Sequence, residues 1–184
     1  MTFSVCIFCG SSFGDDPRYT DAARETGVEI ARRGWTLVYG GARVGLMGVV
    51  ANAALDAGGR VVGVVPRFLY EREVGHDGVT SLEIVGSLTE RKLRMGELSD
   101  AFLSLPGGIG TLDEMFEAWS WSQVGLQSKP SGLLNVAGYY DALVSFIERA
   151  TAAGFVKPQH RQWLSVSDDV GELLDGFRRR PAPP

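Results

Sequence analysis

Residues Leu105–Glu114 read Leu-Pro-Gly-Gly-Ile-Gly-Thr-Leu-Asp-Glu and join a predicted strand to a predicted helix. The run Ala101–Leu105 is short and apolar, as in a buried strand, and apolar residues recur at helical spacing after the glycines. The first N–H groups of a helix have no partner within it and carry the positive end of its dipole. A glycine-rich turn that opens a helix therefore favours an anion site, most often for phosphate.

A second interpretation of this turn needs no ligand. Thr111 and Glu114 have the spacing of a capping box, with Thr111 as the N-cap and Glu114 bonded back to its N–H. The common nucleotide-binding motifs are absent and therefore do not decide between the two interpretations. The turn contains no G-x-G-x-x-G, and Gly40 and Gly45 have phosphate-loop spacing without the Lys and Ser/Thr that should follow.

Composition narrows the function classes. The chain has 184 residues, which predicts one nucleotide-binding domain over 1–177 and a flexible tail over 178–184. A net charge of −4 argues against a general nucleic-acid binder. No apolar run approaches the roughly 18–20 residues that span a bilayer, and no basic leader precedes the first strand, so we predict a cytoplasmic protein with no membrane partner.

Cys6 and Cys9 form a C-x-x-C within the apolar run 3–9. Residues three apart in a strand point to opposite faces, and the only histidines are His76 and His160, so a metal site would lack ligands. We predict two buried, reduced thiols and no metal.

Strand-like and helical segments alternate along the chain. The expected strands are 3–9, 35–39, 60–65, 81–85, 101–105, 132–136 and 163–166. The expected helices are 17–33, 46–57, 88–99, 111–124, 139–153 and 168–177, and 66–80 is expected to be irregular. This order predicts an α/β fold with a mainly parallel sheet and helices on both faces. Ligands of such sheets bind beyond the carboxyl ends of the strands, where the turns 10–12, 40–41 and 106–111 should meet.

The predicted helix 88–99 carries a cation on its core-facing stripe. Leu88, Met95 and Leu98 share this stripe with Arg91, whose guanidinium either passes the core to solvent, pairs with a carboxylate or serves a site. The helix descends about 12 Å from Arg91 to residue 99, at about 1.5 Å per residue. The following strand climbs back about 13 Å, at about 3.3 Å per residue. Arg91 and Lys92 therefore return to the level of the glycine-rich turn.

These motifs resemble those of the Lonely Guy (LOG) family. The resemblance lies in Tyr39–Gly48, in Glu90-Arg91-Lys92, in the Pro106–Glu114 turn, in Lys129-Pro130 and in the run Leu133–Tyr140. It covers about residues 3 to 155, with Ala42 standing where many members have a third glycine. The resemblance implies a Rossmann-like fold, usually a homodimer. It also implies hydrolysis of cytokinin nucleoside 5′-monophosphates to the free base and ribose 5-phosphate.

By that resemblance, Arg91 and Glu114 are the catalytic pair. The expected nucleotide contacts are Ser11, Gly40, Gly41, Glu73, Lys92, Gly107, Gly108, Ile109, Gly110 and Thr111. No cofactor is expected, because a carboxylate can stabilise an oxocarbenium-like ribose or orient the attacking water. The residues leave the individual roles of Arg91 and Glu114 open.

Three other functions are alternatives to this hydrolysis. Lysine decarboxylation usually needs a pyridoxal phosphate lysine, and the chain offers only Lys92, Lys129 and Lys157. A non-catalytic nucleotide carrier would use the same turn with little need for Glu114. A broader purine nucleotide glycosidase would differ only in its base pocket.

Overall fold

The structure, a computed structural model, describes residues 2–179, apart from the side chains of residues 73 and 74. Seven strands form one parallel sheet in the order β4-β3-β2-β1-β5-β6-β7. The strands are β1 Ser4–Phe8, β2 Thr36–Tyr39, β3 Arg60–Pro66, β4 Ser81–Val85, β5 Ala101–Ser104, β6 Ser131–Leu134 and β7 Leu164–Ser167. The helices are α1 Pro17–Arg32, α2 Gly45–Asp56, α3 Arg67–Leu69, η1 Tyr70–Val74, α4 Leu88–Glu97, α5 Ile109–Gln123, η2 Val136–Gly138, α6 Asp141–Ala152, α7 Pro158–Gln162 and α8 Val170–Arg179.

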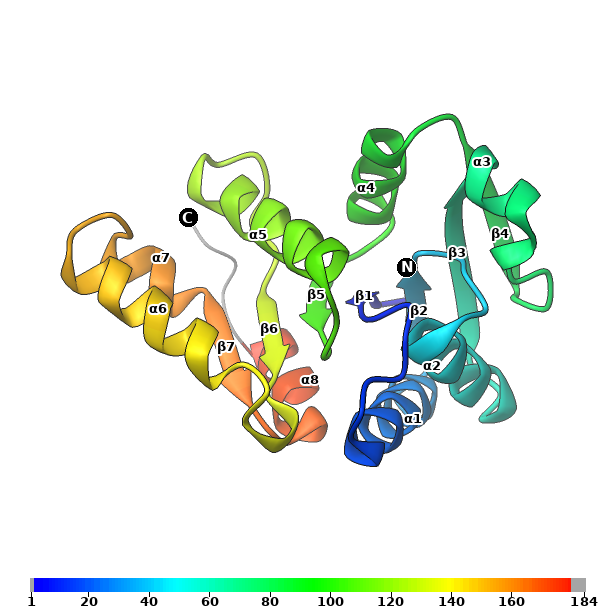
Figure 1. Cartoon of the computed structure of the whole chain (residues 1–184), viewed down its shortest axis with the longest axis horizontal. Coiled ribbons are helices and arrows are strands. Elements are labelled where there is room, and N and C mark those ends of the chain that lie inside the picture. Colours follow the sequence, from blue (N-terminus) through cyan, green and yellow to red (C-terminus); the bar gives the residue numbers. More distant parts are fainter. Residues whose placement is uncertain (1, 180–184) are drawn as a thin grey trace.

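Helices cover both faces of this sheet, as the alternating pattern predicts (Figure 1). Buried side chains of α1, α2 and α8 share one core with one face of the strands. Helices α4, α5 and α6 contribute to two smaller cores on the other face. The Rossmann-like α/β expectation is therefore confirmed, and the sheet is parallel throughout the described residues.

Strand β1 lies at the centre of the sheet, between β2 and β5. The chain leaves β1 for α1 on one face, and it leaves β5 for α5 on the other. The two turns diverge at this point and open a crevice beyond the carboxyl ends of the strands. The fold therefore brings the turns at 10–12, 40–41 and 106–111 to one place.

Several expected boundaries were wrong. Helix α5 begins at Ile109 rather than at residue 111, and α8 continues to Arg179, past the expected start of the tail. Residues 67–74 are helical, with a π-helical stretch in η1, although we expected irregular chain there. The short helix α7 was missed because its five residues are too few to give a periodic signal. Residues 180–184 lie outside the described part.

Cys6 and Cys9 are free, buried thiols, as expected. Cys6 belongs to the core under α4 and α5, and Cys9 belongs to the core under α1 and α2. Their opposite orientation excludes a shared metal or disulfide between them. None of the helices among residues 2–179 is both long and apolar enough to cross a membrane.

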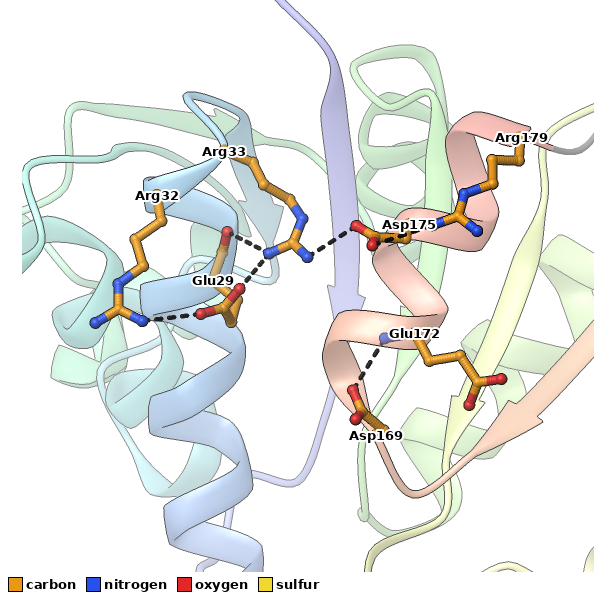
Figure 2. Close-up of polar contacts among 7 residues, drawn as sticks. All are labelled: Glu29, Arg32, Arg33, Asp169, Glu172, Asp175 and Arg179. Carbon is orange, nitrogen blue, oxygen red and sulfur yellow. Dashed lines mark hydrogen bonds and ion pairs between the residues drawn. The ribbon is translucent and has the colours of Figure 1, made fainter.

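An ion-pair network joins the end of α1 to α8 (Figure 2). Arg33 pairs with Glu29 on its own helix, and its Nη2 lies 2.9 Å from Asp175 Oδ1 of α8. Hydrogen bonds from Arg33 lower the pKa values of both the Glu29 and the Asp175 carboxyls. A carboxyl whose pKa is lowered by folding stabilises the fold above its unfolded pKa. This contribution is lost as the pH falls through the folded pKa.

We expect Arg33→Met to lower the melting temperature (Tm) at pH 7 by no more than about 4 °C, because exposed ion pairs contribute little. The difference from wild type should shrink as the pH falls below about 4, where both carboxyls become protonated. Thermal melts between pH 3 and 7 measure it. Arg24→Met is the matched control, because Arg24 pairs with Asp21 in the same helix and that pair does not join α1 to α8. A pH-independent difference would contradict the assignment.

Candidate active site

The N-terminus of helix α5 has no side-chain cap. Gly108 is the N-cap residue and makes no side-chain cap, so the capping box centred on Thr111 is wrong. Thr111 is the third residue of the helix, and its Oγ1 lies only 2.2 Å from where a Cβ on Gly107 would stand. The N–H groups of Ile109, Gly110 and Thr111 have no partners within the helix. This uncapped end keeps the arrangement that favours an anion.

The glycines of the turn serve two different purposes. Gly107 is required by packing, because a Cβ there would lie 2.7 Å from the backbone nitrogen of Gly10. Gly108 and Gly110 face open space, since an added Cβ would meet nothing within 4 Å. One side of the turn is therefore fitted against the β1 loop, and the other is open to a ligand.

Arg91 and Glu114 meet at this end of the sheet. Arg91 Nη1 lies 2.9 Å from Glu114 Oε1, and the two side chains are only 13% and 10% exposed. Arg91 Nε donates a hydrogen bond of 3.2 Å to the Val64 carbonyl. The sequence allowed Arg91 to reach solvent, to pair with a carboxylate or to serve a site. In the structure it pairs with a carboxylate at the site.

Gly40 makes room for this guanidinium. A Cβ on Gly40 would lie 1.8 Å from Arg91 Nη2, so no other residue fits without displacing Arg91. Gly41 has a φ of +72°, a backbone conformation that favours glycine. Its carbonyl accepts a hydrogen bond from the N–H of His76. Ala42 is buried and forms an antiparallel bridge with Gly75. The β2–α2 turn thus shapes the wall beside Arg91.

Burial dominates the electrostatics of the pair. Desolvation raises the pKa of Glu114 above its usual value, and Arg91 opposes this by favouring the charged form. The pKa of the neighbouring Cys9 thiol is raised by burial and by the Glu114 charge, so Cys9 is a neutral thiol at neutral pH. Cys9 is therefore no nucleophile there, and Glu114 is the titratable group suited to chemistry.

A cavity of about 220 Å³ brings most of the expected residues together. Its lining is Ile7, Cys9, Ser11, Gly40, Met47, Arg91, Gly108, Ile109, Gly110, Thr111 and Glu114. Lys92 does not line it, because its Nζ lies 3.0 Å from Asp113 and 2.8 Å from Glu117 on the flank of α5. The expected contact from Glu73 falls on a side chain outside the described part, although its backbone lies in η1.

A second cavity of about 290 Å³ adjoins the first and shares Ser11 and Gly108 with it. Gly107 lines this second cavity, together with the aromatic side chains of Phe13, Tyr19 and Tyr139. Among the described residues, no cluster of three or more His, Cys, Asp or Glu side chains could hold a metal ion. The first cavity offers a buried carboxylate, a guanidinium and backbone N–H groups.

Known proteins share both the sequence and this fold. A family profile described as "possible lysine decarboxylase" matches residues 47–177. A probable cytokinin riboside 5′-monophosphate phosphoribohydrolase of Oryza sativa subsp. japonica is 49% identical over 170 residues, covering 92% of this chain and 75% of the relative. The cytokinin riboside 5′-monophosphate phosphoribohydrolase of Rhodococcoides fascians is 49% identical over 176 residues, covering 95% and 89%. This chain belongs to the LOG family.

Solved structures agree on the fold of this LOG chain. The molybdenum cofactor binding protein of Rippkaea orientalis superposes with a TM-score of 0.74 at 21% identity, over 97% of this chain and 96% of that one. The Moco carrier protein of Chlamydomonas reinhardtii gives a TM-score of 0.72 at 22% identity, over 97% of each. At such low identity the likeness extends to the fold alone.

Sequence reasoning about the LOG chain missed several residues of the site. Val64, which accepts a hydrogen bond from Arg91, is an apolar residue in a run that is typical of ordinary core. Met47 lines the cavity and belongs to the stretch Tyr39–Gly48 that supported the family resemblance, but it was not expected as a contact. Phe13 and Tyr19 belong to the β1–α1 region, where the chemistry was assigned only to the small residues. Tyr139 carried a signal, because it belongs to the run Leu133–Tyr140 that supported the family resemblance.

Proposed function

We propose that this LOG protein hydrolyses the N-glycosidic bond of cytokinin nucleoside 5′-monophosphates, releasing the free base and ribose 5-phosphate. Relatives that are 44–49% identical carry the name of this activity. The observation that carries the proposal is the buried Arg91–Glu114 pair beside an uncapped helix N-terminus. In this arrangement the N–H groups of Gly108–Thr111 bind the 5′-phosphate, and Glu114 faces the ribose.

The chemistry follows from the charges. Cleavage develops positive charge on the ribose, and the Glu114 carboxylate stabilises that charge or orients the attacking water. Arg91 favours the ionised form of Glu114 and so opposes the desolvation that raises the pKa of this carboxyl. Ser11 lines the same cavity. We leave Lys92 out of the phosphate site, because two carboxylates already hold it.

One incubation distinguishes this proposal from its alternatives. The protein is mixed separately with N6-isopentenyl-AMP, AMP and lysine, and the products are identified by mass spectrometry. Free N6-isopentenyladenine with ribose 5-phosphate supports the proposal. Equal turnover of AMP would indicate a broader nucleotide glycosidase, cadaverine a decarboxylase, and binding without any product a carrier.

We predict a strong requirement for the 5′-phosphate. The N–H groups at the start of α5 are satisfied by an anion, and a riboside leaves them unpaired at about 1–3 kcal/mol for each buried group. The value of kcat/KM on N6-isopentenyladenosine should therefore fall at least about tenfold below that on its 5′-monophosphate. Equal values for the two substrates would mean that the turn binds no phosphate.

We also propose a homodimer. Met115 and Trp119 are buried under α5, whereas Trp121 packs against Gly96 of α4 and borders an open apolar groove. The exposed side chains of Leu93 and Leu126 line this groove. Helices α4 and α5 and the residue that ends α5 also expose the apolar side chains of Leu88, Phe116 and Val124. A second copy would cover them. Light scattering at micromolar concentration should give twice the chain mass, and a monomer would contradict this proposal. A cytoplasmic location stays a prediction from the sequence.

A further inference from the structure

The turn between β6 and α6 is held in an unusual backbone conformation. Ala137 has a φ of +54°, and it is the only non-glycine residue with a positive φ among residues 2–179. The side chain of Asn135, which precedes the turn, is bonded to the two residues that begin α6. Its Oδ1 accepts the Tyr140 N–H at 2.7 Å, and its Nδ2 donates to Asp141 Oδ1 at 2.7 Å. A strained backbone kept by such bonds indicates a functional constraint.

This turn delivers two tyrosine hydroxyls to the glycine-rich turn. Tyr140 Oη donates to the Leu105 carbonyl at 2.6 Å, and Tyr139 Oη donates to the Gly107 carbonyl at 2.6 Å. The two remaining carbonyls, those of Pro106 and Gly108, accept bonds from the N–H groups of Gly10 and Leu112. All four carbonyls from 105 to 108 are therefore held by the protein.

Because the peptide bond is planar, a hydrogen bond that fixes a carbonyl group also fixes the direction of the N–H group of the next residue. In a trans peptide the C=O and the following N–H point in opposite directions. Fixing the Gly107 carbonyl with Tyr139 therefore directs the Gly108 N–H the other way, toward the open side of the turn. Within the described residues, that N–H donates to no acceptor, and a Cβ on Gly108 would meet nothing within 4 Å.

We infer that Tyr139 is a positioning residue for the 5′-phosphate, an inference that rests on the proposed function. Both residues of the Gly107–Gly108 peptide lack a Cβ, so little steric cost opposes a flip of this peptide plane. A flip replaces the Gly108 N–H with the Gly107 carbonyl oxygen, which repels an anion. The Tyr139 hydroxyl prevents this, although Tyr139 lines the adjoining cavity on the other side of the turn.

Tyr140 provides a contrast on the same turn. Its hydroxyl fixes the Leu105 carbonyl, but the next residue is Pro106, which has no N–H to direct. Tyr140 is also buried, at 2% exposed, so loss of its hydroxyl leaves a buried carbonyl unpaired. Tyr140 therefore supports stability, whereas Tyr139 controls an N–H group of the site.

The test compares Tyr139→Phe with two variants that make the same chemical change. Tyr70→Phe is the matched control, because its hydroxyl hydrogen-bonds Asp77 Oδ1 at 3.1 Å and Tyr70 lines neither of the two cavities. Calorimetry gives the Kd of AMP and of adenosine for each variant, and thermal melts give Tm. Steady-state assays on N6-isopentenyl-AMP give kcat and KM separately.

We expect Tyr139→Phe to raise the Kd of AMP and the KM about 3–10-fold, the size of one lost neutral hydrogen bond. The Kd of adenosine, kcat and Tm should stay near wild type. Tyr70→Phe should match wild type, and Tyr140→Phe should lower Tm while keeping the AMP-to-adenosine ratio. Equal weakening of AMP and adenosine in Tyr139→Phe, or no weakening of AMP, would overturn the inference. A wild-type protein that binds N6-isopentenyl-AMP without cleaving it would overturn the proposed function, and the comparison of AMP and adenosine affinities would still test Tyr139.

Discussion

Glu114→Gln is expected to lower kcat at least about a hundredfold while the protein still folds and binds AMP. The change keeps the shape of the side chain and removes its negative charge, where positive charge develops on the ribose. A preorganised charge of this kind contributes about 10²–10³ in rate. Stability should change modestly, because the amide oxygen of Gln can still accept a bond from Arg91 Nη1, which lies 2.9 Å from Glu114 Oε1.

The measurement is kcat, AMP affinity and Tm for the variant and for Glu117→Gln. Glu117 lies on the same helix and pairs with Lys92 outside the cavity, so it makes a matched control with near wild-type kcat. The double variant Glu114→Gln/Arg91→Met should be little worse than either single change, because residues that act as a unit are not additive. Near wild-type turnover in Glu114→Gln would remove Glu114 from the chemistry.

Arg91→Met is expected to move the acid limb of the pH–rate profile to higher pH. Burial raises the pKa of Glu114, and the Arg91 charge counteracts that rise. Without the guanidinium the pKa rises further, so more of the carboxyl is protonated and inactive at pH 7. Activity at pH 7 should fall about a hundredfold, and part of the loss should be recovered as the pH is raised. A higher KM with an unchanged acid limb would instead indicate that Arg91 binds only the phosphate.

Gly40→Ala tests the same point without touching either charged residue. Its Cβ would stand 1.8 Å from Arg91 Nη2, so the guanidinium must leave its place between Glu114 and the Val64 carbonyl. The pH–rate profile should shift in the same direction as in Arg91→Met. Gly176→Ala is the control, because an added Cβ there meets nothing within 4 Å. An unchanged acid limb in Gly40→Ala would show that Arg91 does not set the charge of Glu114.

Local sequence patterns predicted the seven strands, the longer helices between them and a mainly parallel sheet. Buried parallel strands are continuous apolar runs, and surface helices are periodic, so both kinds of segment are visible without tertiary information. The strand-to-helix position of the Leu105–Glu114 segment followed from the same patterns. The lengths of α4 and β5 alone predicted that Arg91 lies near the carboxyl ends of the strands. The contact between Arg91 and Glu114 confirms this position.

Only the tertiary structure decided which partner each polar group takes. Thr111 and Glu114 have capping-box spacing, yet α5 begins at Ile109 and Glu114 turns to Arg91. Lys92 has the same level as Arg91, but its neighbours on α5 are carboxylates. The roles of Gly40 and Tyr139 were equally hidden, because each depends on an atom from a distant segment that approaches within a few ångströms. Spacing along a chain fixes the face and height of a side chain, whereas its contacts depend on how separate elements pack.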